Sequence, residues 1–316
     1  MAEHDGTRMS RLKLPLPPRL LARAVGAAVR DWYGRLIRLP ERPRASHVRL
    51  DRLLPHRRNV TADEIRALCL AVPYGDDTVL CRVLGRFKLF ADARDRTLSP
   101  YLILDGAWEL FVTEAVVSRL RPGMTVFDAG ANLGYFTLLM AALVGPAGRV
   151  HAAEPNPRLA MLLRQSVAAN NFDGRVTVHQ SPLGAAPGAE VILRVPDGRP
   201  MNGHVVSGSG PAAMPVQSVD EIIGDGPLDA VKIDVEGAEW DVWQGMEKVL
   251  ARGQPMTVFL EFNRHRLADA GALLDSIARH GFSLAWIHPK HGILPIDRAT
   301  ILAREGVEDW MLLLSR

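Results

Sequence analysis

The stretch VFDAGANLGYFTLL, residues 126–139, is a short apolar run that ends in an acid, then a glycine-containing turn. Asp128 stands near the end of the run, and Gly130 and Gly134 lie four residues apart with Asn132 between them. Glycine lets a backbone approach a ligand closely. Because a helix-like apolar pattern follows, the stretch predicts a strand, a turn and a helix that together hold a nucleotide.

Strands and helices alternate around this turn. Strands are predicted at 125–129, 149–154, 175–180, 229–234, 256–262, 282–288 and 309–316, and helices at 134–144, 157–170, 239–251 and 266–280. Such alternation is typical of a parallel sheet with right-handed crossovers. The last two strands have no long helix between them, which predicts an antiparallel C-terminal hairpin at one edge. The prediction is therefore an α/β fold with a mostly parallel, seven-stranded sheet and an N-terminal helical extension.

The N-terminal arm, residues 1–60, carries the basic character of the chain. It holds fourteen Lys or Arg and five Asp or Glu, a balance of +9, whereas the other 256 residues hold 24 and 30, a balance of −6. Residues 19–39 place apolar side chains at helical spacing, with arginines opposite them. A basic amphipathic helix can lie on an anionic membrane surface or pack against protein, and both interpretations stay open.

A lead-in segment, residues 61–123, precedes the regular pattern. Thr61 followed by Glu64 has the spacing of a capping box and predicts that a helix starts there. Strand-like alternation follows over 79–104, and a helix is predicted at 107–120. The expected domain organisation is thus the arm, the lead-in and a cofactor-binding domain over 124–316.

Composition limits the cellular context. Cys69 and Cys81 lie twelve residues apart with no histidine cluster, which favours neither disulfides nor zinc but two buried thiols in a reducing cytoplasm. Residues 1–18 do not read as a signal peptide. No run reaches the roughly 18–20 apolar residues that span a bilayer. We therefore expect a cytoplasmic protein with possible membrane association through residues 19–39.

Glu154 ends the second predicted strand, twenty residues after Gly134, where a carboxylate accepts hydrogen bonds from ribose hydroxyls. Dinucleotide enzymes and methyltransferases share this combination, so Asn132 is the detail that discriminates between them. A dinucleotide fingerprint needs G-x-G-x-x-G, but Asn132 and Tyr135 take its third and sixth places and would crowd a pyrophosphate. Asp128 would repel a phosphate and suits a cationic ligand. The turn therefore predicts S-adenosylmethionine rather than a nicotinamide dinucleotide.

The same stretch, followed by GRVHAAEPNPRLAMLLRQSVAANN and by VQSVDEIIGDGPLDAVKIDVEGAEWDVWQGMEKVL at 216–250, resembles the FkbM family of S-adenosylmethionine-dependent O-methyltransferases. The segment KIDVEGAE, residues 232–239, is the most specific feature. The similarity covers roughly 100–265 and leaves the arm outside. It implies a class I methyltransferase fold and methylation of a hydroxyl on a sugar, a glycolipid or a polyketide-type product.

Spacing and resemblance together suggest the cofactor site. Its candidates are Glu109, Asp128, Gly130, Asn132, Gly134, Glu154, Asn156, Leu183 and Gly184. The glycine turn would shape the methionine and ribose pocket, Glu154 and Asn156 its ribose rim, and Leu183 and Gly184 the adenine border. Many relatives have an acid after that glycine, whereas Ala185 stands here, so the adenine N6 contact stays open between Gln180, Ser181 and a backbone carbonyl. Glu109 either reaches the amino group of the cofactor or lies at the surface.

Chemistry is expected at the end of the fourth strand. Asp234, Glu236 and Glu239 are three carboxylates within six residues. A hydroxyl acceptor must lose its proton during attack, so a general base is needed; Asp234 or Glu236 is favoured, His204 is a weaker candidate, and Glu239 has a helix cap as its alternative. If Mg²⁺ took part, Asp234, Glu261 and Asn263 would be its ligands, but the resemblance does not require a metal.

Two other functions compete with a hydroxyl methyltransferase. One is a nicotinamide-dependent oxidoreductase, against which Asn132 argues. The other is an RNA-binding methyltransferase that uses the basic arm. The arm has little interleaved aromatic content and the rest of the chain is acidic, which favours a docking arm over a sequence reader. We expect a small-molecule or glycan acceptor and no specific nucleic acid.

Overall fold

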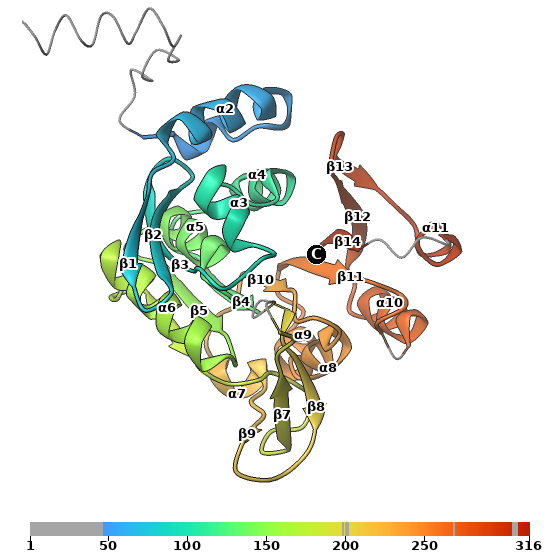
Figure 1. The fold of residues 1–316 in the computed structure, drawn as a ribbon. Coiled ribbons are helices and arrows are strands. Elements are labelled where there is room, and N and C mark those ends of the chain that lie inside the picture. Colours follow the sequence, from blue (N-terminus) through green and yellow to red (C-terminus); the bar gives the residue numbers. More distant parts are fainter. Residues whose placement is uncertain (1–46, 198, 200–201, 268, 305–308) are drawn as a thin grey trace, which may run out of the picture. The chain divides into compact units, whose positions relative to one another are not determined.

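A central eight-stranded sheet runs through the computed structural model (Figure 1), which describes residues 47–316 except 198, 200–201, 268 and 305–308. Its strands lie in the order β13 (Gly292–Pro295), β12 (Ser283–His288), β14 (Trp310–Ser315), β11 (Thr257–Phe262), β10 (Ala230–Ile233), β4 (Thr125–Ala129), β5 (Arg149–Ala153) and β6 (Val176–His179). The pairs from β11 to β6 are parallel, and β14 is antiparallel to both of its neighbours. The predicted α/β fold is confirmed.

The C-terminal edge differs from the prediction. The predicted antiparallel pairing of the strands at 282–288 and 309–316 is confirmed in β12 and β14. Seven strands were expected, however, and β13 adds an eighth, so that β12 and β13 form the hairpin at the edge. The last strand, β14, lies inside the sheet between β11 and β12. Its residues from Trp310 to Leu314 are all buried, so both of its faces need cover. The shorter β13, which ends in Pro295, suits an edge because proline cannot donate to a further strand.

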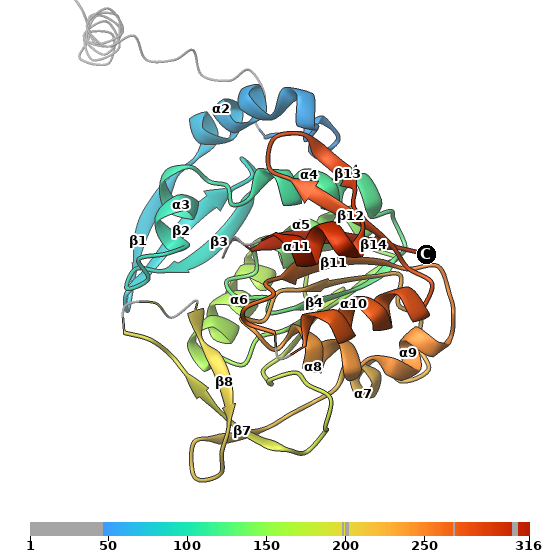
Figure 2. The same ribbon diagram turned by 90° about the vertical axis from the view of Figure 1, so that its right-hand side faces the viewer.

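Helices cover both faces of the sheet (Figure 2). One core contains α4 (Leu110–Arg119), α5 (Tyr135–Val144) and α6 (Pro157–Ala169); the other contains α7 (Val219–Ile223), α8 (Glu239–Gln244), α9 (Glu247–Ala251), α10 (Ala270–Arg279) and α11 (Arg298–Ala303). The helix predicted at 239–251 is divided at Gly245. A β-carbon there would lie 2.2 Å from the carbonyl oxygen of Gly184, so the chain turns where it meets this loop.

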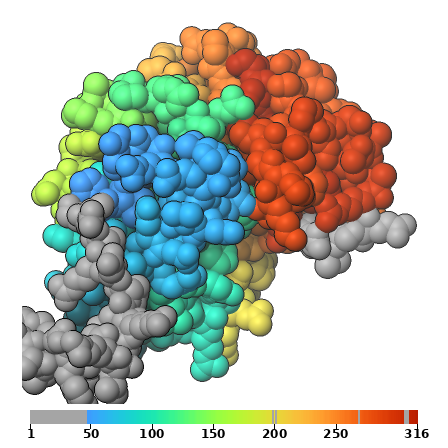
Figure 3. Space-filling model, turned by 90° about the horizontal axis from the view of Figure 1, so that it is seen from above, coloured from blue at the N-terminus to red at the C-terminus, as the bar shows by residue number. Residues whose placement is uncertain are grey.

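The chain divides into two units, residues 1–44 and residues 45–316. The lead-in therefore belongs to the same unit as the central sheet. Residues 47–60, predicted as the end of the arm, contain two 3-10 helices, η1 (Leu50–Arg52) and η2 (Pro55–Arg57), and the start of α2 (Arg58–Leu68), which continues into the lead-in. The lead-in then forms the sheet of β1 (Ala71–Gly75), β2 (Thr78–Val83) and β3 (Phe87–Asp92), and α3 (Ser99–Leu104). The backbone N–H of Phe90 in β3 donates to Ser166 Oγ in α6 at 3.0 Å. Arg58 donates to the carbonyl of Pro289, so α2 lies beside the β12–β13 hairpin (Figure 3).

Two predictions for the lead-in were wrong. The capping box at Thr61 does not form, because α2 begins at Arg58 and Thr61 is buried within it. The region predicted as strand up to 104 contains α3. Its first turn is fixed by Asp95, whose carboxylate accepts from the backbone N–H groups of Leu98 and Ser99 at 2.8 and 2.6 Å. Asp95 lies three and four residues before these two N–H groups. A strand prediction from alternating apolar residues does not detect a contact at that spacing.

The glycine-rich region forms a third sheet, in the order β8 (His204–Ser207), β7 (Glu190–Arg194) and β9 (Ala213–Pro215). Cys69 and Cys81 are both free, and Cys81 is buried. The helix predicted at 19–39 lies outside the described residues. Within the part of the chain that the structure describes, no helix has the length and apolar character that crossing a membrane requires.

Candidate active site

A cavity of about 220 Å³ opens at the carboxyl ends of β4, β5, β10 and β11. The lead-in supplies Thr97, Leu98, Trp108 and Glu109 to its wall, and the small third sheet supplies Leu193 and Val205. The central sheet and its loops supply Asp128, Gly130, Asn132, Tyr135, Phe136, Glu154, Asn156, Ser181, Leu183, Lys232, Asp234, Glu236 and Glu261, among others. This is the place where open parallel sheets bind ligands.

The two glycines of the turn have different roles. Gly130 has φ +78°, and a β-carbon there would lie 1.8 Å from the carbonyl oxygen of Asp234. It therefore allows the ends of β4 and β10 to meet at the cavity. Gly134 has φ +92° and precedes α5, but it does not line the cavity, and a β-carbon there would lie 2.3 Å from Leu163 Cδ1. Its role is to pack α5 on α6.

Glu154 holds the turn in place. Its Oε2 accepts from the backbone N–H of Asn132 at 2.9 Å, and its Oε1 accepts from that of Asn156 at 2.8 Å. Burial raises the pKa of Glu154 to about 7. Asn132 has φ +54°, and its Oδ1 accepts from the N–H of Leu133. Asn156 lines the cavity and also caps α6, because its Oδ1 accepts from the N–H of Arg158.

In the segment after β6, Ser181 and Leu183 line the cavity, whereas Gly184 does not. Gly184 instead packs near Val216. Of the two side chains left open for the adenine contact, Ser181 lines the cavity and donates to Gln217 Oε1 at 2.6 Å. Gln180 does not line it and accepts from Arg164.

Two further carboxylates face the turn. Asp128 is fully buried, and Thr137 Oγ1 donates to its Oδ2 at 2.5 Å, while Oδ1 has no hydrogen-bond partner among the described residues. Glu109 has φ +39°, a conformation that costs a non-glycine residue energy and is frequent at functional sites. Burial, together with the nearby Asp234, raises the pKa of Glu109 to about 7. Both side chains suit a cationic ligand.

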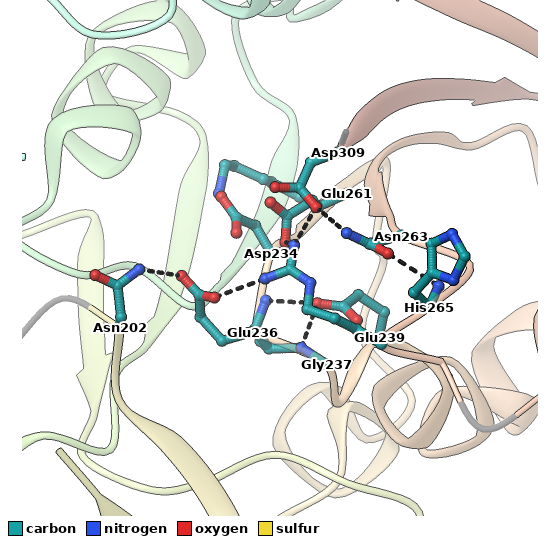
Figure 4. A network of polar contacts seen from close by, with 12 residues as sticks. Asn202, Asp234, Glu236, Gly237, Glu239, Glu261, Asn263, His265 and Asp309 are labelled. Atoms are coloured by element: carbon teal, nitrogen blue, oxygen red, sulfur yellow. Dashed lines mark hydrogen bonds and ion pairs between the residues drawn. The ribbon is translucent and has the colours of Figure 1, made fainter. Parts of the chain in front are cut away.

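Three acids from separate places converge on an arginine, because Glu236 follows β10, Glu261 lies in β11 and Asp309 precedes β14 (Figure 4). Arg266 contacts Glu236 at 2.7 Å, Glu261 at 3.0 Å and Asp309 at 2.5 Å. Glu236 also accepts from Asn202 Nδ2 at 3.2 Å. Burial and the nearby Asp234 raise the pKa of Glu261. The positive charge of the Arg266 guanidinium therefore balances the negative charge of these acids.

Three residues that were predicted for the site do not line the cavity. Glu239 accepts from the backbone N–H groups of Val235 and Gly237, so it holds the loop after β10 and does not line the cavity. His204 is exposed, and it is its neighbours Gly203 and Val205 that line the cavity. Asn263 donates to Asp309 at 2.6 Å instead of joining Glu261 at a shared point.

The magnesium alternative has no geometric support in this arrangement. Asn263 is engaged by Asp309, and Arg266 lies against Glu261. Within the described ranges, no group of three or more His, Cys, Asp or Glu is placed to hold a metal ion. Sequence reasoning also missed two basic residues of the site, Lys232 and Arg266. Lys232 had a detectable signal, since it stands two residues before Asp234, and side chains two residues apart along an extended chain point to the same side.

Comparison with known proteins decides the family. The sequence model of the Methyltransferase FkbM domain matches residues 128–284, from Asp128 at the glycine turn through Glu154, Asp234 and Glu261. Residues 128–284 form an FkbM-family methyltransferase domain. S-adenosylmethionine is the cofactor of this family, in agreement with the sequence prediction. The FkbM domain thus contains most of the cavity wall, while the lead-in adds Glu109 and its neighbours.

Curated relatives match over limited lengths. The chain is 39% identical over 85 residues to the 31-O-demethyl-FK506 methyltransferase FkbM of Streptomyces tacrolimicus, which covers 27% of this chain and 32% of that protein. It is 28% identical over 165 residues to Methyltransferase 1 of Beauveria bassiana, covering 44% and 65%. It is 43% identical over 58 residues to the protein-L-isoaspartate O-methyltransferase of Aeropyrum pernix, covering 18% and 22%. The matches thus span less than two thirds of each of these relatives.

Among solved structures, the O-methyltransferase from Bacillus cereus in complex with SAH aligns with 13% identity and a TM-score of 0.38. The alignment covers 71% of this chain and 84% of that chain. The SAM-dependent O-methyltransferase from Thermotoga maritima aligns with 13% identity and a TM-score of 0.37, covering 64% and 63%.

Proposed function

We propose that this protein transfers a methyl group from S-adenosylmethionine to a hydroxyl of a small-molecule or glycan acceptor, such as a sugar, a glycolipid or a polyketide-type product. The observation that carries the proposal is the cavity wall. Asp128 and Glu109 line the cavity beside the glycine turn, where two acids can bind a cationic ligand. Glu154 also lines the cavity, and we assign it to the ribose. Bound there, S-adenosylmethionine supplies an electrophilic methyl group on a positively charged sulfur.

The residues fit this cofactor. Gly130 lines the cavity and, having no side chain, lets the backbone of Asp234 reach the β4 turn. The unpartnered Oδ1 of Asp128 and the strained Glu109 provide negative charge for an ammonium group. Glu154 has both oxygens fixed by backbone N–H groups, and its remaining lone pairs are available to ribose hydroxyls.

Asp234 is our choice of general base. Lys232 Nζ donates to its Oδ2 at 2.7 Å, and among the described residues its Oδ1 takes no hydrogen bond, so one oxygen is free for an acceptor hydroxyl. Both oxygens of Glu236 are engaged, by Asn202 and Arg266. Asp234 would orient the hydroxyl and accept its proton as the oxygen attacks. Such orientation supplies much of the acceleration in a transfer of this kind.

The competing functions fit the wall less well. A nicotinamide dinucleotide would bring a diphosphate against Asp128, Glu109 and the side chain of Asn132. An RNA acceptor would bring phosphates to a cavity whose described charged wall residues are six acids and one lysine. The resulting repulsion favours an uncharged hydroxyl acceptor.

We further propose that residues 19–39 contact an anionic membrane surface, which would bring a glycolipid acceptor within reach. The support is the basic amphipathic pattern of that segment. Flotation of the full chain with phosphatidylglycerol vesicles tests this idea. Trp32→Glu should weaken flotation, whereas flotation that is equal for this variant and the parent chain would contradict it.

Acceptor activity is tested with labelled S-adenosylmethionine and fractionated cell extract, with mass spectrometry for products that gain one methylene unit. We expect label in a glycan, glycolipid or polyketide fraction. Asp234→Asn should reduce the label at least about 100-fold, while the exposed Asp275→Asn should not. Label that appears only in RNA or protein would overturn the proposed acceptor class.

A further inference from the structure

Lys232 is a buried lysine in the wall of the cavity. It lies in β10, opposite Asp128 of β4 in the parallel register, so the two side chains are neighbours on one face of the sheet. Its side chain is 3% exposed, and its ammonium lies 5.1 Å from the ring centre of Phe136. Lysine is rarely buried to this extent unless it is paired. Its partner is Asp234, at 2.7 Å.

The surrounding charges keep this lysine ionised. Burial alone would lower its pKa, but Asp234 and Asp128, followed by Glu109, outweigh burial and raise it. Of the described residues that line the cavity, Lys232 alone is positively charged, and Glu109, Asp128 and Asp234 are the acids that interact with it. One positive charge thus stands against three carboxylates beside the glycine turn.

We propose that Lys232 sets the net charge of this wall and thereby the preference of the site for the charged methyl donor over its neutral product. The proposal rests on the proposed function. During transfer the acceptor oxygen forms a bond to the methyl carbon, the carbon–sulfur bond breaks, and its electron pair stays on sulfur. The hydroxyl proton passes to Asp234. Sulfur loses its positive charge in that step, so the attraction between wall and ligand falls.

The partial neutralisation has a consequence for turnover. A wall with three carboxylates and no lysine would hold the sulfonium more tightly than the reaction needs. A wall neutralised further would not distinguish donor from product by charge. Because both ligands carry the same amino acid and adenosine groups, the ratio of their dissociation constants isolates the contribution of the sulfonium charge.

The test is calorimetry of the full chain with S-adenosylmethionine and with S-adenosylhomocysteine, which needs no acceptor. Relative to the parent chain, Lys232→Met should shift the ratio of the two dissociation constants about tenfold toward the donor, because one positive charge near the sulfonium is removed. Asp128→Asn should shift it about tenfold toward the product. Lys232→Arg keeps the charge and should leave the ratio within about threefold. The exposed Lys248→Met is the matched control and should leave it unchanged.

A combined variant guards against a folding failure of Lys232→Met. Lys232→Met with Asp128→Asn restores the charge balance of the wall, and its ratio should return to within about threefold of the parent value. Equal weakening of both ligands by Lys232→Met would show that the lysine contacts a group common to them, and would overturn the inference. A ratio of dissociation constants that stays shifted in the combined variant would also overturn the inference. If the parent chain binds neither ligand, the proposed function itself fails.

Discussion

The carbonyl oxygen of Asp234 occupies the position into which a side chain at Gly130 would point, 1.8 Å from an ideal β-carbon. The cofactor turn and the proposed base are therefore joined by direct backbone contact. Gly130→Ala must push the ends of β4 and β10 apart. We expect it to destabilise the fold by about 3 kcal/mol or more and to abolish binding of S-adenosylmethionine, measured by denaturant unfolding and calorimetry.

Gly123→Ala separates this clash from backbone strain. Gly123 also has a positive φ, +89°, but a β-carbon there has nothing within 4 Å. Its replacement should cost only about 1–2 kcal/mol, the usual penalty for a left-handed residue, with cofactor affinity retained. Equal losses in the two variants would mean that contact with Asp234 is not what requires a glycine at 130.

Glu154→Gln tests the acid that fixes the turn. The amide nitrogen of glutamine cannot accept, so one of the two N–H groups, from Asn132 or Asn156, loses its partner. We expect a destabilisation of about 1–3 kcal/mol and a cofactor affinity that falls at least tenfold. The exposed Asp173→Asn serves as control. Unchanged affinity in the Glu154 variant would remove Glu154 from the cofactor site.

Arg266→Met tests the charge network of Arg266 with its three acids. Glu236, Glu261 and Asp309 would then face one another without a cation. Because this arginine is partly exposed, we expect a loss of about 1–3 kcal/mol in unfolding free energy. Adding Glu261→Gln should recover part of it. Arg298→Met breaks an exposed pair with Asp275 and should cost less than about 1 kcal/mol. Similar losses for both arginines would contradict the network.

Glu109 should make stability depend on pH. Burial raises its pKa to about 7 from an ordinary value of 4.5. The folded protein thus holds the proton more tightly than the unfolded chain. This contribution to stability is complete below pH 4.5 and is lost as pH rises through about 7. Glu109→Gln should therefore stabilise the ligand-free protein at pH 8.5 relative to pH 5. A thermal shift between variant and parent chain that is the same at both pH values would contradict this assignment.

Sequence patterns predicted the central elements well where period and local chemistry agree. The strand at 125–129, the turn and the helix after it are found within a residue of their predicted bounds. The position of β14 was not predictable from its own residues, since a uniformly apolar run suits any interior place in a sheet. The first turn of α3 depends on Asp95, and α2 begins at Arg58, three residues before the predicted cap at Thr61.

Only those site residues that belong to a local sequence motif could be predicted from the sequence. Glu154 and Asp128 follow from their places at strand ends, and both line the cavity. Gly134 belongs to the motif but packs against Leu163 of the next helix, α6, a tertiary contact that the motif does not reveal. Arg266 meets Asp309 and Glu236 only because three separate loops converge (Figure 4). Such convergence depends on tertiary structure and leaves no spacing signal.

The central claim is that the turn at Gly130 receives a positively charged sulfur cofactor and not a diphosphate. Calorimetry of the purified, ligand-stripped full chain with S-adenosylmethionine, S-adenosylhomocysteine and NAD in parallel tests it most directly. We predict one-to-one binding of the first two and no binding of NAD. Heat with NAD alone, or with none of the three, would contradict the claim.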